Sequence, residues 1–177
     1  MKHRLRQWLG LPAIETRQHQ LLLAQARVLA AIQREWCSLD TLTQAEWSIY
    51  SQWGEDGILD WLVEQLPNIP KVFVELGCGD YEECNTRCLM ELRNWAGDIF
   101  DANPDFIEHI KQQSYYWRYT ITAQCRNITK ANLPYLSDEY GLLSLDLDGM
   151  DYWIWDALPL RPWLVVCEYN DLFGKKA

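Results

Sequence analysis

The hydrophobic positions change period along the chain, and this change predicts the order of its elements. Residues 14–36 contain no Gly or Pro and are rich in Leu, Ala, Gln and Arg, so they predict one helix. We expect this helix to pack on the domain or on a second copy of the chain. Its apolar stripe consists of Leu21, Leu22, Val28, Leu29 and Ile32.

Five short apolar runs follow, and each closes on polar residues. A nearly continuous apolar run is typical of a parallel strand that is buried on both faces. The runs lie within residues 72–80, 97–105, 115–129, 141–151 and 163–171. Since helical stretches separate several of these runs, the pattern predicts an α/β protein with a sheet of mostly parallel strands.

Two of the intervening helices have recognisable patterns. Apolar residues recur at helical spacing from Ile58 to Leu66, after Gly54 and Gly57, and Asp56 is the expected N-terminal cap of that helix. Residues 83–94 predict a second helix, between the first two strands. We therefore divide the chain into an N-terminal helical extension and an α/β domain, with ranges 1–45 and 46–177.

Charge and cysteine content narrow the classes of partner and compartment. The net charge of −9 argues against a nucleic-acid partner, because phosphate backbones require clustered Lys and Arg. The six cysteines show no C-x-x-C pair, and no secretory signal opens the sequence, so a reducing, cytoplasmic location is expected. No run reaches the ~20 apolar residues of a transmembrane helix.

The polar residues that end the apolar runs are the candidate functional residues. In a doubly wound sheet the ligand lies beyond the carboxyl ends of the strands, so these side chains should converge. The strand-end candidates are Glu75, Gly77, Gly79, Asp80, Asp101, Asn103, Asp146, Asp148, Asp151, Glu168, Asn170 and Asp171.

The glycine loop after the first strand reads Gly-Cys-Gly-Asp and does not fit a phosphate cradle. The dinucleotide fingerprint needs a third glycine at position 82, which is Glu, and Glu83 would repel a pyrophosphate. A cationic or neutral ligand with a ribose fits better, because Asp101 ends the neighbouring strand, where a carboxylate can accept from both ribose hydroxyls.

These motifs resemble a class I S-adenosylmethionine-dependent methyltransferase, whose first motif is an acid-x-G-x-G loop and whose second strand ends in an acid. VFVELGCGD and IFDAN match that pattern. More narrowly, YSQWGEDGILDWLVEQLP, FVELGCGDYEECNTRCL, LSLDLDGMDYWIW and VVCEYN look like the FkbM-type methyltransferases, over residues 49–173. The resemblance implies a Rossmann-like sheet and O-methylation of a hydroxyl on a sugar, glycan or natural-product precursor.

The resemblance also implies a role for each strand-end residue. Gly77 and Gly79 would let S-adenosylmethionine approach the backbone, while Glu75 would orient its amino-acid end. Asp101, followed by Asn103, would hold the ribose. The loop at 125–127 would lie near the adenine.

The acids after the fourth and fifth strands allow two further interpretations. Asp146, Asp148, Glu168 and Asn170 offer the hard oxygen ligands that Mg²⁺ favours, and the ion would activate the acceptor hydroxyl. The alternative to a metal site is that Asp146 lies near the sulfonium of the cofactor while Asp148 caps the following helix. Without a metal, Asp146, Asp148 or Glu168 would act as the general base.

Two other classes of function remain open. The D-x-D of residues 146–148 is compatible with a metal-dependent glycosyltransferase, although that scheme gives the glycine loop and Asp101 no role. The second is a non-catalytic cofactor-binding or assembly module that acts through the N-terminal helix.

Since a class I methyltransferase normally has seven strands, the predicted domain is short at its C-terminal end. An exposed sheet edge or the N-terminal helix would then favour a homo-oligomer or a partner protein.

Overall fold

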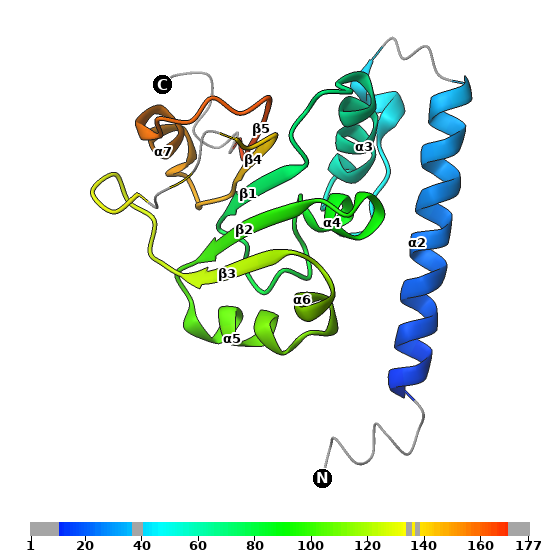
Figure 1. Ribbon diagram of the computed structural model, residues 1–177, viewed down its shortest axis with the longest axis horizontal. Coiled ribbons are helices and arrows are strands. Elements are labelled where there is room, and N and C mark those ends of the chain that lie inside the picture. The colour runs from blue at the N-terminus through cyan, green and yellow to red at the C-terminus, as the bar shows by residue number, and fades with distance from the viewer. Residues whose placement is uncertain (1–10, 37–40, 134–135, 137–138, 170–177) are drawn as a thin grey trace.

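The structure is a computed structural model, and it describes residues 11–36, 41–133, 136 and 139–169. One sheet forms the centre of the molecule, and all its neighbouring strands pair in parallel in the order β3-β2-β1-β4-β5 (Figure 1). The strands are β1 (Val72–Leu76), β2 (Ala96–Asp101), β3 (Ile121–Cys125), β4 (Leu142–Leu145) and β5 (Leu164–Cys167). This order is that of the first five strands of a Rossmann-type doubly wound sheet. The predicted α/β class is confirmed.

Alternate strand residues face two separate cores, because successive side chains of a strand point to opposite sides of the sheet. Phe73 and Ile99 pack in one core with α3 (Glu55–Gln65), α4 (Arg87–Arg93) and α5 (Pro104–Gln112). Val74 and Phe100 pack in the other core with Ile154 of α7 (Asp151–Ala157). The centre of the sheet is therefore covered on both faces, which explains the continuous apolar runs of β1 and β4. The domain also contains the helix α6 (Ser114–Arg118) and the 3₁₀ turn η1 (Leu42–Ala45), which precedes α3.

The long helix α2 (Leu11–Trp36) docks on the domain with small and polar residues. Ala26, Ala30 and Gln33 are buried, and the Gln33 amide donates to the carbonyl of Ala45 at 2.7 Å. The helix therefore packs on the domain, which is one of the two arrangements expected for it, and the close approach uses its alanine face rather than its apolar stripe. All five stripe residues stay between 42% and 64% exposed: Leu21, Leu22, Val28, Leu29 and Ile32.

Two predicted elements have different bounds in the structure. The helix expected over 83–94 begins only at Arg87, because the backbone N–H of Asn85 and the hydroxyl of Thr86 donate to the buried carboxylate of Glu75 and hold the preceding segment in turns. The strand expected within 115–129 is limited to β3. The aromatic residues before it form α6, whose Tyr115 is buried in the core.

Two strands lie at the edges of the sheet. β3 and β5 each pair with one neighbour among the described strands, and the side chains of β5 are half-buried. Among the described residues, no helix combines the length and hydropathy needed to cross a membrane.

Candidate functional site

The two glycines of the loop after β1 are required for different reasons. Both have positive φ, +84° at Gly77 and +54° at Gly79. A Cβ on Gly77 would lie 1.8 Å from the carbonyl oxygen of Asp146, so this glycine permits close contact between the loop and the end of β4. A Cβ on Gly79 would meet no atom within 4 Å, so Gly79 faces open space where a ligand could approach.

The backbone N–H groups of this loop are already occupied. Gly77 and Cys78 both donate to the carbonyl of Phe100, at 2.9 and 3.1 Å, and Gly79 donates to the carboxylate of Asp101 at 2.9 Å. A loop that binds phosphate needs such N–H groups free to point at the ligand. The hydrogen bonds therefore agree with the sequence-based argument against a pyrophosphate.

Asp101 ends β2 and joins two loops. One carboxylate oxygen accepts from Gly79, and the other accepts from the backbone N–H of Asn103 at 2.7 Å. Because a carboxylate has about four acceptor positions, capacity remains for ligand hydroxyls. The Asn103 side chain caps α5 by accepting from the N–H of Asp105 at 2.9 Å. Asn103 thus has a structural task at the position where the sequence suggested a cofactor contact.

Glu75 lies beneath the site as a buried carboxyl. It is 2% exposed and accepts from the N–H of Asn85 at 3.1 Å and from the hydroxyls of Thr86 and Ser144. Burial raises its pKa from 4.5 to about 7, and these hydrogen bonds oppose the rise. Near neutral pH this group is poised between its acid and its carboxylate.

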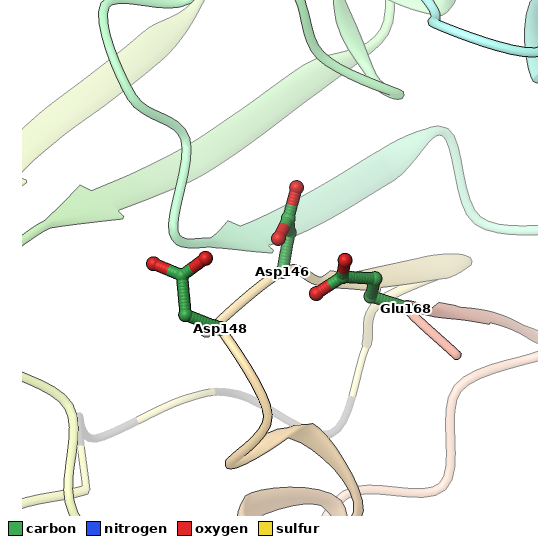
Figure 2. Close-up of side chains that lie close together, drawn as sticks. All are labelled: Asp146, Asp148 and Glu168. Atoms are coloured by element: carbon green, nitrogen blue, oxygen red, sulfur yellow. The ribbon is translucent and has the colours of Figure 1, made fainter. Parts of the chain in front are cut away.

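Three of the four predicted metal ligands come together in space. Asp146, Asp148 and Glu168 each offer a carboxylate oxygen within 4.8 Å of the others, and all three side chains are exposed (Figure 2). Burial, followed by repulsion from Glu168, Asp151 and Asp148, raises the pKa of Asp146 to about 6. The donor set suits a hard divalent cation. Asn170, the fourth candidate ligand, lies outside the described residues.

The turn after β4 depends on Asp151. Its carboxylate accepts from the N–H groups of Leu147 at 2.6 Å and Gly149 at 3.0 Å, so Asp151 fixes the turn that carries Asp148. The suggestion that Asp148 caps α7 is wrong, because Met150 is the N-cap and Asp148 adopts a left-handed φ of +51°. Asp148 is consequently presented to solvent beside Asp146.

Two pockets open at the carboxyl ends of the strands and share Gly77, Glu83 and Asp146. The larger, about 600 Å³, lies on the β2–β3 side and is lined by Gly79, Asp101 and residues 126–129. The smaller, about 310 Å³, lies on the β5 side and includes Glu75 and Glu168. Seven of the predicted strand-end residues line these two adjoining chambers: Glu75, Gly77, Gly79, Asp101, Asp146, Asp148 and Glu168. Three others line neither of them: Asp80, Asn103 and Asp151.

The segment SQWGEDG forms one wall of the smaller pocket. The predicted capping role of Asp56 is wrong, since Gly54 is the N-cap of α3. Instead, one carboxylate oxygen of Asp56 accepts from the N–H groups of residues 49, 50 and 51, at 2.6, 2.7 and 3.1 Å. This contact folds the segment so that Gln52, Trp53 and Glu55 line the pocket. No helical periodicity could reveal such a turn.

The smaller pocket also has an aromatic rim that the strand-end rule did not find. Trp53 and Tyr169 line it and remain 75% and 68% exposed. A large exposed aromatic beside carboxylates provides a flat apolar surface with hydrogen-bond acceptors around it. The sequence signal was the surplus of ten Trp, which by itself does not say which Trp is exposed.

Comparisons with known proteins find distant structural similarity. No protein-family model matches the chain, and no curated protein matches its sequence. Among solved structures, an S-adenosylmethionine-dependent methyltransferase from Clostridium acetobutylicum matches with 13% identity and a TM-score of 0.42, over 73% of this chain and 46% of that one. Coclaurine N-methyltransferase, bound to N-methylheliamine and SAH, matches with 14% identity and a TM-score of 0.37, over 82% and 49%. The chain spans about half the length of these two structures.

Proposed function

We propose that this chain is an S-adenosylmethionine-dependent O-methyltransferase domain of the FkbM type. The observation that carries the proposal is the larger pocket, in which the open side of Gly79, the carboxylate of Asp101 and the acid of Asp146 line one space of about 600 Å³. Its acidic lining and occupied loop N–H groups suit a nucleoside with a cationic group, and they disfavour a phosphate. In this proposal the larger pocket takes the nucleoside, and the smaller one takes the acceptor.

The residues present fit such a cofactor, which when bound supplies an electrophilic methyl group on a sulfonium. Asp101 would accept from the ribose hydroxyls, and Glu75 would support the loop that faces the amino-acid end. Asp146 lines both pockets and is placed to take the proton from an acceptor hydroxyl. A pKa of about 6 leaves it ionised at neutral pH, as a general base must be.

A divalent ion would also help to deprotonate the acceptor hydroxyl. Asp146, Asp148 and Glu168 would hold Mg²⁺, and the ion would supply a lowered pKa for the acceptor hydroxyl. The acceptor we propose is a hydroxyl of a sugar, glycan or natural-product precursor. The exposed ring of Trp53 at the rim of the smaller pocket supports this class, because a sugar face can stack on it.

Isothermal titration with S-adenosylmethionine and S-adenosylhomocysteine tests the proposal. We expect micromolar binding, and Asp101→Asn should weaken it at least ten-fold, since a charge-assisted hydrogen bond contributes about 1.5–3 kcal/mol. Asp105→Asn, which changes an exposed carboxylate on α5, should have no effect. A folded chain that binds UDP-glucose with Mn²⁺, and neither of these two ligands, would instead establish the glycosyltransferase alternative.

A further inference from the structure

A separate cavity of about 410 Å³ lies between α2, α4 and α6. Residues far apart in sequence build it, from positions 16–27, 87–91 and 113–119. In Figure 1, α2 and α4 lie beyond the opposite end of the sheet from the arrowheads of β1, β2 and β3. The proposed methyltransferase site therefore does not include this cavity.

The cavity is rich in cations, although the chain as a whole has a net charge of −9. Three guanidinium groups line it, those of Arg27, Arg87 and Arg118, against one carboxylate, that of Glu91. Glu91 is fully engaged, because one oxygen lies 3.0 Å from Nε of Arg87 and the other 2.8 Å from Nε2 of His19. The single acid of the lining thus cannot neutralise the remaining two arginines.

Arg87 forms the fixed floor of the cavity. It is buried, it donates to the carbonyl of Tyr81 at 2.9 Å, and its guanidinium lies 4.4 Å from the ring centroids of both Tyr50 and Tyr115. Glu82 lies 3.5 Å from the same guanidinium. Because Arg87 is paired with Glu91 and Glu82, the unbalanced positive charge of the cavity belongs to the other two arginines.

Arg27 and Arg118 are the unbalanced pair. Neither makes an ion pair or hydrogen bond with any other described residue, and both are exposed at the cavity. The Arg118 guanidinium lies 5.5 Å from the ring centroid of Tyr119, and Arg27 lines the same cavity. Two neighbouring guanidinium groups repel each other, and an anion placed between them removes that cost.

The cavity wall also contains a polar group without a partner. Tyr115 is 6% exposed, and its hydroxyl has no hydrogen-bond partner among the described residues. A buried hydroxyl normally has such a partner, which can come from protein, water or a ligand. Tyr115 thus leaves one hydrogen-bonding requirement of the cavity wall unmet among the described residues.

We propose that this cavity binds a small phosphorylated molecule, with its phosphate between Arg27 and Arg118. The planar guanidinium fork matches phosphate oxygens in a bidentate manner. A phosphate carries nearly two negative charges at neutral pH and a carboxylate carries one, so two arginines favour a phosphate. A volume of about 410 Å³ is in the range of small-molecule sites and exceeds what a bare phosphate fills. Tyr115 and Tyr119 provide aromatic walls for the rest of the molecule.

Isothermal titration of the full chain with glucose 6-phosphate, inorganic phosphate and glucose tests this inference. Glucose 6-phosphate should bind more tightly than inorganic phosphate, and glucose should not bind. The double variant Arg27→Ala, Arg118→Ala should weaken binding at least ten-fold. Arg17→Ala removes a cation of α2 that does not line the cavity, so it should leave the affinity unchanged.

Three results would overturn the inference: no binding of either phosphate by the folded chain, equal loss in Arg17→Ala and the double variant, or inorganic phosphate binding as tightly as glucose 6-phosphate. Thermal unfolding of each variant by circular dichroism shows that the comparison is between folded proteins. S-adenosylmethionine affinity, measured in the same samples, should be equal in all of them. The outcome at this cavity is thus separable from that of the proposed enzymatic function.

Discussion

Replacement of Glu75 by Gln should remove a large part of the pH dependence of stability. The buried carboxyl has a pKa of about 7 in the folded chain, against 4.5 for an exposed Glu. Since a pKa difference of one corresponds to about 1.4 kcal/mol of free energy, this difference corresponds to about 3 kcal/mol of stability. This contribution to the free energy of unfolding is fully present below pH 4.5, where Glu75 is protonated in both the folded and the unfolded chain. It is lost as the pH rises through about 7.

The assay is urea unfolding, followed by tryptophan fluorescence, at intervals between pH 5 and pH 8. The free energy of unfolding of the parent should fall across this range more steeply than that of Glu75→Gln, because an amide does not ionise. Other titrating groups, such as Asp146, contribute to both proteins and cancel in the difference. Glu108→Gln, an exposed change on α5, should follow the parent. Parallel pH profiles for the parent and Glu75→Gln would refute the reasoning, whatever constant offset separates them.

Three further predictions concern the loop, the acids and the long helix. Gly77→Ala should fail to fold or lose several kcal/mol of its free energy of unfolding, because its Cβ would meet a backbone carbonyl oxygen at 1.8 Å. Gly79→Ala should fold and be about 1 kcal/mol less stable than the parent, so equal thermal unfolding midpoints for the two variants would contradict this distinction. Mg²⁺ should bind the chain in isothermal titration and Asp148→Asn should weaken it at least ten-fold, while unchanged affinity would remove Asp148 from the site. The exposed stripe of α2 should pair with a second copy, so Leu21→Lys with Val28→Lys should lower the mass seen by light scattering; a parent that is already monomeric at high concentration would exclude this association.

The sheet was predictable from the sequence because its determinants are local. The central strands β1 and β4 are apolar runs buried on both faces, and such a run looks the same whatever its neighbours are. The errors fell where a distant or non-periodic contact decides the conformation. Residues 83–86 have helical composition, yet they turn because the carboxyl of Glu75 takes two of their donors. Tyr115 is aromatic like a strand residue, but the core that it joins is filled by a short helix.

The candidate site was predictable in outline for the same reason. Parallel strands bring their carboxyl ends to one edge, so Asp101, Asp146 and Glu168 could be grouped from strand order alone. The roles of Asp56 and Asp151 could not, since each accepts from backbone N–H groups that only the folded turn presents. The arginine cavity has no sequence signature, because three separate segments supply its charges.

The hydrogen bonds of the glycine loop have a consequence for binding energetics. The loop is hydrogen-bonded to the end of β2 through the backbone N–H groups of Gly77, Cys78 and Gly79. These bonds hold its conformation before any ligand binds. A ligand that enters such a preorganised cradle loses only its own freedom, because the ordering entropy of the loop was already spent during folding. We therefore expect association without slow rearrangement of the backbone, and selectivity set by the shape of the chamber.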